Sequence, residues 1–109
     1  MTADILTAAG VTNRQGRFIR MPAETYAVFF DDKTVDAADR VSAAGRLPGI
    51  VTHDVTIEVY EPTPDDKAEA AIEAELDARG LSWTKQDRIW VDAAQRYQVI
   101  YEYSYTEKT

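Results

Sequence analysis

The stretch YQVIYEYSY, residues 97–105, is the feature that most restricts how this chain can fold. Its apolar and aromatic residues recur at every second position, a period that places them on one face of a β-strand. The pattern includes one valine and four of the six tyrosines: Tyr97, Val99, Tyr101, Tyr103 and Tyr105. This aromatic face either packs as sheet core beneath helices or contributes in part to an assembly surface.

Two earlier segments also have the composition of strands. ETYAVFFDD, from residue 24 to about residue 31, is rich in aromatic and β-branched residues. Both of its faces are apolar, so we expect it to be covered on both sides, either as a central strand or as an edge that a partner covers. THDVTIEVYEP, residues 52–62, alternates apolar and polar residues and predicts a sheet with one buried face.

Helical signals occur in TADILTAAG, residues 2–10, and most clearly over residues 63–79. In the second segment Thr63 is the predicted N-cap, Pro64 occupies the first turn, and Gly80 is the residue that ends the helix. The helix has an apolar stripe suited to close packing on a sheet. The stripe consists of Ala68, Ala71, Ile72 and Leu76.

Residues 81–93 and 95–108 predict two more strands, joined by a turn near 92–95 into an antiparallel hairpin. The predicted fold class is therefore α+β, in the order αββαββ, with a largely antiparallel four-stranded sheet and helices packed on one face. All 109 residues are expected to form a single domain. Within it, residues 1–23 should form an N-terminal helix and loop, and residues 33–52 a long, mobile loop.

The net charge of −7 disfavours nonspecific binding to nucleic-acid phosphates or anionic lipid. No apolar run approaches the roughly 18 residues needed to span a bilayer. Two charge runs of opposite sign stand out, since seven acids lie between residues 61 and 77 and three arginines lie in RQGRFIR. The arginines are Arg14, Arg17 and Arg20. Each run is either solvated surface or one side of a charge-complementary contact between neighbouring copies.

Few side chains could carry chemistry. The chain has no cysteine, which excludes disulfides, thiolate zinc sites and thiol nucleophiles. Its one histidine, His53, opens a predicted strand, with no serine in a nucleophile-elbow setting and no second imidazole to bind a metal. We therefore expect His53 to have a structural or surface role.

Two groups of acids have a second interpretation. Four aspartates resemble a hard-cation site, but a calcium loop's glycine and terminal glutamate are missing, which favours a solvated strand end. These aspartates are Asp31, Asp32, Asp36 and Asp39. Glu58 and Glu102 share the polar face of the sheet and could act as an acid–base pair, although exposed glutamates on such a face are ordinary. No catalytic, cofactor-binding or metal-binding residue is assigned, no cofactor is expected, and the chain is predicted not to be an enzyme.

The order of these pieces resembles a family of small proteins encoded in the tail-assembly region of siphophage and prophage genomes. These are tail-completion, head–tail joining or minor tail proteins. The likeness rests on TYAVFFDD, VTIEVYEP followed by an acidic helix, LDARGLSW and the closing YQVIYEYSY, and it is firmest over residues 53–105. The resemblance implies an αβ domain that works by assembly, as in tail terminators that form rings at the end of the tail tube.

The function implied by this resemblance is structural: tail completion, tail termination or head–tail joining through protein–protein assembly. Expected partners are phage tail or connector proteins and further copies in a ring, with no sequence-specific nucleic-acid binding and no membrane. The expected locations are the bacterial cytoplasm during assembly and the tail or neck of the virion. The alternative is a small cytoplasmic ligand-binding or regulatory α+β domain.

Overall fold

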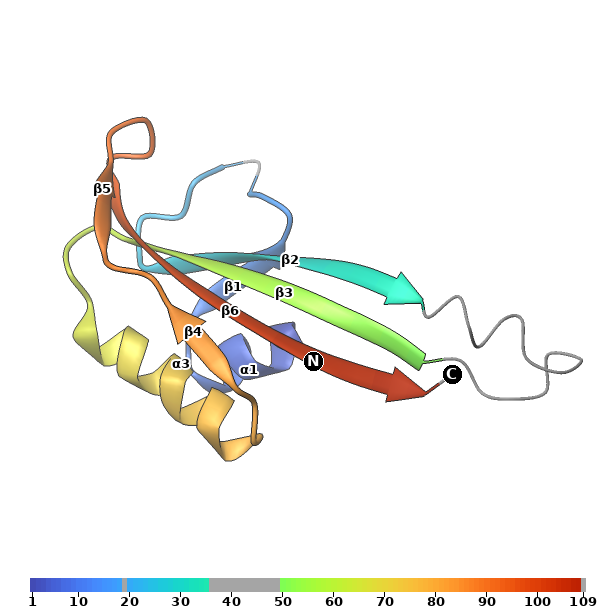
Figure 1. The fold of residues 1–109 in the computed structure, drawn as a ribbon. Coiled ribbons are helices and arrows are strands. Elements are labelled where there is room, and N and C mark those ends of the chain that lie inside the picture. Colours follow the sequence, from blue (N-terminus) through green and yellow to red (C-terminus); the bar gives the residue numbers. More distant parts are fainter. Residues whose placement is uncertain (19, 36–49, 109) are drawn as a thin grey trace, which may run out of the picture.

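The computed structural model describes residues 1–18, 20–35 and 50–108 (Figure 1). Within these residues the chain forms two helices and six strands. In chain order they are α1 (Thr2–Ala8), β1 (Thr12–Gln15), β2 (Tyr26–Val35), β3 (Ile50–Glu61), α3 (Asp66–Ala78), β4 (Trp83–Lys85), β5 (Ile89–Val91) and β6 (Arg96–Lys108). Neither described helix has the length and apolar content to span a bilayer.

The sheet is larger and more mixed than the predicted one. Its strand order is β1-β2-β3-β6-β4, and β5 also pairs with β6. β1 runs parallel to β2, whereas the other pairs are antiparallel. The αββαββ prediction with four antiparallel strands is therefore wrong. An additional strand, β1, lies in the segment expected to be a loop, and the polar residues 86–88 divide the predicted strand 81–93 into β4 and β5.

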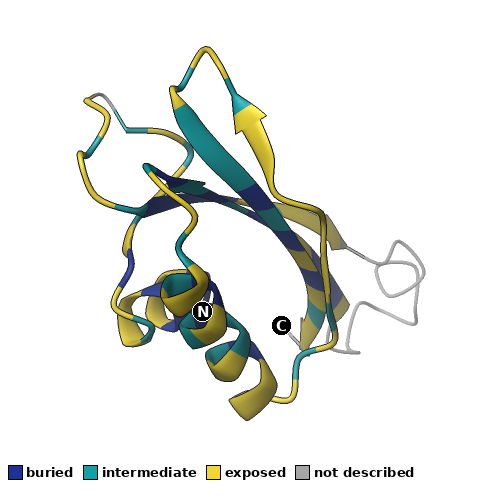
Figure 2. Ribbon diagram, turned by 90° about the vertical axis from the view of Figure 1, so that its left-hand side faces the viewer, coloured by how far each residue is buried: buried dark blue, intermediate teal, exposed yellow. Residues whose placement is uncertain are grey.

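The core lies between the helices and one face of the sheet (Figure 2). Because side chains alternate along a strand, the odd-numbered residues of β2, β3 and β6 point to the helices. Ile72 and Leu76 of α3 are fully buried there, which confirms the centre of the predicted stripe, while Ala68 and Ala71 are half-buried at its margin. Burying two large aliphatic side chains of α3 stabilises its packing by a few kcal/mol (about 1.5–3 kcal/mol each).

Helix α3 begins two residues later than predicted. Its N-cap is Asp65, whose carboxylate accepts a hydrogen bond from the backbone amide of Ala68 at 3.0 Å. Thr63 is therefore not the cap, because the carboxylate two residues later reaches the free amides of the first turn. Asp65 also accepts a hydrogen bond from the hydroxyl of Thr25 at 2.6 Å. The helix ends just before Gly80, whose φ of +70° suits glycine, as predicted.

The tyrosine row of β6 changes its environment along the strand. Tyr101 and Tyr103 are buried beneath the helices and belong to the core. Tyr97 is half-buried and meets the ring of Trp90 edge to face, with ring centres 5.0 Å apart. Tyr105 is half-buried too, and it packs against the margin of the core, where its ring stacks on that of Tyr103. The row is therefore core in its middle and only partly buried at both ends.

Strands β2, β3 and β6 continue past the helices (Figure 1). Residues 31–35, 50–54 and 104–108 form this three-stranded extension, which we call the arm. The arm makes the chain elongated: the Cα radius of gyration is 16.4 Å, against about 13 Å for a compact domain of this length. Residues 33–35 and 50–52, which were predicted to belong to a loop at 33–52, are part of the arm strands. The segment 36–49 lies outside the described residues.

Candidate functional site

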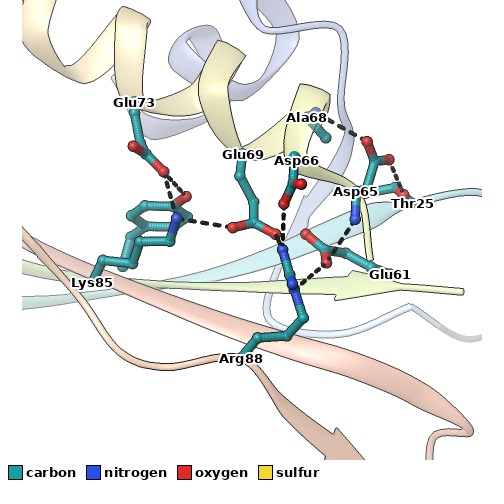
Figure 3. A network of polar contacts seen from close by, with 10 residues as sticks. Thr25, Glu61, Asp65, Asp66, Ala68, Glu69, Glu73, Lys85 and Arg88 are labelled. Carbon is teal, nitrogen blue, oxygen red and sulfur yellow. Dashed lines mark hydrogen bonds and ion pairs between the residues drawn. The ribbon is translucent and has the colours of Figure 1, made fainter. Parts of the chain in front are cut away.

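A buried polar network joins α3 to the sheet (Figure 3). Glu61, the last residue of β3, has no solvent exposure, and Glu69 in α3 is 4% exposed. Arg88 lies between β4 and β5. Its Nε forms an ion pair with Glu61 at 3.3 Å, and its Nη2 donates a hydrogen bond to Glu69 at 2.6 Å. The same Nη2 lies 2.7 Å from the carboxylate of Asp66. Arg88 therefore connects three carboxyl groups from two elements.

Lys85 of β4 extends this network along α3. Its Nζ lies 2.9 Å from Glu69 and 2.8 Å from Glu73. The hydroxyl of Tyr101 donates to the same Glu73 oxygen at 2.6 Å. Burial and this hydrogen bond raise the pKa of Tyr101, so it remains a neutral donor at physiological pH. The network thus connects α3 with β3, with β6 and with the segment that contains β4 and β5.

Glu61 and Glu69 titrate as a coupled pair. Burial, followed by the hydrogen bond with Glu69, raises the pKa of Glu61 to about 7. Desolvation also acts on Glu69, but hydrogen bonds with Glu61, Arg88 and Lys85 outweigh it and lower the pKa of Glu69. Oε2 of Glu61 accepts no hydrogen bond from any described residue. That oxygen suits a proton that it donates to Glu69, so the pair holds about one proton below pH 7 and loses it as the pH rises above 7.

A carboxyl group with a pKa near 7 is often a catalytic acid or base. Here the two carboxyl groups are 0% and 4% exposed, so a substrate has no access to them. The network therefore has a structural role: its ion pairs and hydrogen bonds hold α3 against the sheet. The sequence does carry a signal for it: Glu61 continues the buried odd-numbered series of β3, and Glu69 lies three residues before Ile72 on the apolar stripe.

The acidic run at residues 61–77 is satisfied within the chain. Besides the five acids already described, the two others also have partners: Glu75 pairs with Arg79 at 3.9 Å, and Asp77 accepts a hydrogen bond from the indole Nε1 of Trp83 at 2.8 Å. The basic side chains Arg14, Arg17 and Arg20 are exposed. The side chain of Asp66 is nevertheless 91% exposed, so a contact between the two runs of neighbouring copies stays a prediction.

His53 ties the three strands of the arm together. Its Nδ1 lies 2.9 Å from Asp31 on β2, and its Nε2 lies 2.8 Å from Glu107 on β6. The ring stacks on Tyr105 with ring centres 4.4 Å apart. The hydrogen bond with Glu107, opposed by desolvation and reinforced by Asp31, raises the pKa of His53 and favours the imidazolium. His53 is therefore structural.

The two carboxylates contact opposite nitrogens of the ring, so they do not converge on a point where a metal ion would bind. No group of three acidic or histidine side chains in the described part of the chain has the geometry of a metal site. Asp32 is exposed on the other face of the sheet, whereas Asp36 and Asp39 lie outside the described residues.

Glu58 and Glu102 both lie on the outer face of the sheet, opposite the helices. Glu58 accepts a hydrogen bond from the hydroxyl of Tyr60 at 2.9 Å. Glu102 accepts one from the side-chain amide of Gln86, also at 2.9 Å. Each carboxylate is thus held by a different donor.

The outer face also carries an aromatic hollow of about 220 Å³, which we call the outer hollow. Its apolar lining consists of Phe18, Met21, Tyr26, Val28, Phe30 and Tyr60, and Arg17 and Glu58 lie at its margin. Met21 and Phe30 are 44% and 41% exposed. The rings of Tyr26 and Tyr60, which both line the hollow, stack with centres 5.2 Å apart.

The size and composition of the outer hollow indicate what it can bind. Ligand pockets usually measure about 300–1,000 Å³, so this hollow suits one or two side chains better than a whole ligand. Aromatic residues, methionine and arginine are also enriched at protein interfaces. Tyr26 and Val28, on the outer face of β2, are buried, and the ring of Phe18 packs edge to face on Tyr26 with ring centres 5.4 Å apart. The expectation that β2 is covered on both faces is therefore confirmed for this part of the strand.

The sequence matches no protein-family model and no curated protein. One solved structure that resembles it is a chain of the "Virion of native gene transfer agent (GTA) particle", with a TM-score of 0.60. The two chains share a fold. The likeness covers 98% of this chain and 86% of that chain at 19% sequence identity.

Two surfaces are therefore candidates for function: the outer hollow and the arm. Both are formed by strands of the shared fold, and both expose groups that proteins use to bind one another. The titratable groups with shifted pKa values instead serve the folding of the chain, since they connect elements within it.

Proposed function

We propose that this protein is a structural component of a phage-like particle that acts by protein–protein assembly. Its role is at the tail, in tail completion, tail termination or head–tail joining. The main support is the fold shared with a virion chain over 98% of the present chain. The order of sequence pieces, which resembles the tail-completion family, supports the same role.

Several properties of the chain suit such a role. The coupled carboxyl pair is buried, which fits a protein without enzymatic activity. The net charge of −7 disfavours binding of the protein to the phosphates of DNA that passes nearby. The outer hollow can accept an apolar side chain of a tail or connector protein. We place the protein in the bacterial cytoplasm during assembly and in the tail or neck of the finished particle.

The test is deletion of the gene from an inducible prophage that carries it. We expect infectious particles to fall by orders of magnitude, and electron microscopy to show heads and tails that are separate, or tails of irregular length. Expression of the intact protein from a plasmid should restore joined particles. Normal titres of complete particles without the gene would contradict the proposal and favour the alternative, a ligand-binding or regulatory domain.

A second measurement locates the protein. Antibody labelling of purified particles should mark one end of the tail or the neck. Labelling along the whole tail, or none in particles that are otherwise complete, would exclude a role at the tail end.

A further inference from the structure

Charges of opposite sign lie on either side of the outer hollow. In the register of the sheet, Val28 of β2 has Arg14 of β1 as one neighbour and Glu58 of β3 as the other. Residues opposite one another on adjacent strands point to the same face, so both charged side chains lie on the outer face, and two strand spacings separate their Cα positions by about 10 Å. Arg17, which follows β1 closely in the chain, lies at the margin of the hollow. The hollow therefore has a positive side towards β1 and a negative side towards β3.

The two arginines on the positive side are not compensated by the chain itself. Arg14 and Arg17 are exposed, and no side chain among the described residues forms an ion pair or a hydrogen bond with either of them. By contrast, each of the basic residues on or beside α3 contacts a carboxylate, namely Arg79, Lys85 and Arg88. An aromatic hollow of the size of a side chain, with unpaired guanidinium groups beside it, suits an apolar side chain that is accompanied by carboxylates.

We propose that the outer hollow binds a segment of another particle protein in which one large apolar side chain, the anchor, is accompanied by acidic residues. The anchor fills the hollow between the aromatic rings. The acids lie on the side towards β1, where Arg14 and Arg17 meet them. The inference rests on the proposed function and deepens it, because it names the chemistry by which the partner is recognised.

The acidic run of a second copy does not supply such an anchor. Most of that run lies on α3, whose large apolar side chains, Ile72 and Leu76, are fully buried against the sheet. The exposed apolar residues of α3 are alanines, which are too small to fill a hollow of about 220 Å³. The segment that binds therefore belongs to a different protein, which exposes its own anchor beside its acids.

A single nucleic-acid strand is the other class of ligand that binds aromatic rings beside arginines. Such a strand carries a phosphate at every nucleotide and would bring one of these charges close to Glu58. A peptide, in contrast, can place its acids on the side of Arg14 and Arg17 alone. The net charge of −7 also disfavours a polyanion. These charges favour the acidic peptide segment.

Three synthetic peptides of equal length test the chemistry of the ligand. The first is labelled with a fluorophore and has a phenylalanine in its centre, aspartates and glutamates on one side of it, and serines and glycines on the other. The second has lysines in place of the acids, and the third has serine in place of the phenylalanine. Fluorescence anisotropy with the purified protein should show the first peptide binding about ten-fold more tightly than either of the others. Added salt should weaken this binding, since it screens exposed charges.

Paired variants of the protein locate the binding. Arg17→Glu should weaken binding of the acidic peptide about ten-fold, whereas Lys67→Glu, which changes the net charge equally at an exposed position of α3, should leave it unchanged. Phe30→Ser should likewise weaken binding, whereas Ile89→Ser should not. Because all four side chains are exposed, we expect unchanged melting temperatures, which would exclude misfolding as the cause.

Several results would overturn the inference. The first is a lysine peptide that binds as tightly as the acidic one, and the second is an Arg17→Glu variant that binds the acidic peptide as the intact protein does. Oligothymidylate that displaces the peptide from the intact protein and fails to bind Phe30→Ser would assign the hollow to nucleic acid instead.

The deletion strain separates this inference from the proposed function. Expression of Arg17→Glu should restore far fewer joined particles than expression of Lys67→Glu. If Arg17→Glu restores a normal titre, the hollow does not bind an acidic segment during assembly, and the proposed function stands with another contact. Normal particles without the gene refute the proposed function, even if the acidic peptide binds as expected.

Discussion

The proton shared by Glu61 and Glu69 makes a specific prediction for stability against pH. Glu61 has a pKa of about 7 in the folded protein and an ordinary value of 4.5. A carboxyl group with a raised folded pKa stabilises the fold at low pH, and this stabilisation is lost as pH rises from 4.5 to about 7. The difference between these values corresponds to about 3 kcal/mol of unfolding free energy.

The variant Glu61→Gln isolates this contribution. Glutamine keeps an oxygen for Arg88 and for the amide of Asp65, and its NH₂ group replaces the proton donated to Glu69. It does not titrate. The variant should match the intact protein near pH 4, below the ordinary pKa of 4.5, and exceed its stability by up to about 3 kcal/mol near pH 8. Urea unfolding at a series of pH values measures the difference.

Subtracting the two curves removes the other groups that titrate in this range. His53, which lies in the arm, contributes equally to both proteins. Glu69 does not, because its pKa depends on Glu61, so the difference between the curves reports the pair. Glu102→Gln, the same substitution at an exposed position, should give a curve parallel to that of the intact protein. If the curve of Glu61→Gln is also parallel to that of the intact protein, Glu61 is ionised in the folded protein at pH 7. The interpretation that Glu61 and Glu69 share a proton would then be wrong.

Three further predictions concern other parts of the molecule. His53→Ala should speed amide hydrogen exchange in the arm but not in α3, and in the intact protein the protection due to His53 should be present below its ordinary pKa of 6.5 and lost as pH rises through its raised folded pKa. Leu76→Ala should lower the unfolding free energy by about 2–5 kcal/mol in urea, since the side chain is fully buried. Met21→Ser with Phe30→Ser should reduce particle titre at an unchanged melting temperature, whereas Ile89→Ser, an equally exposed position away from the outer hollow, should leave the titre unchanged.

Sequence periodicity predicted the elements that carry the core. The alternation in residues 52–62 and 97–105 and the stripe of the helix at 63–79 arise because burial selects apolar residues at the period of each element. β1 could not be predicted in this way. Its residues, TNRQ, are polar, and it is a strand because its backbone satisfies the edge of β2. The break between β4 and β5 at residues 86–88 could not be predicted either, because Arg88 contacts carboxyl groups that are distant in sequence.

The groups with shifted pKa values were predicted less well than the fold. His53 contacts Asp31 and Glu107, which are 22 and 54 residues away, and no local pattern indicates such pairs. Glu61 and Glu69 occupy positions that periodicity assigns to the core. Their charge led to a solvated surface being predicted, although a buried carboxyl group is tolerated where a proton or an arginine compensates it.

The position of β6 has a consequence for biosynthesis. It is the last strand in the sequence, yet it lies between β3 and β4 at the centre of the sheet. A nascent chain that has reached only β5 has no partner for one side of β3, and β4 and β5 have no strand on which to pair. Contacts of such long sequence separation form slowly. Folding of the sheet must therefore wait until β6 has left the ribosome, and premature termination before residue 96 would leave a chain with an exposed apolar strand rather than a shortened domain.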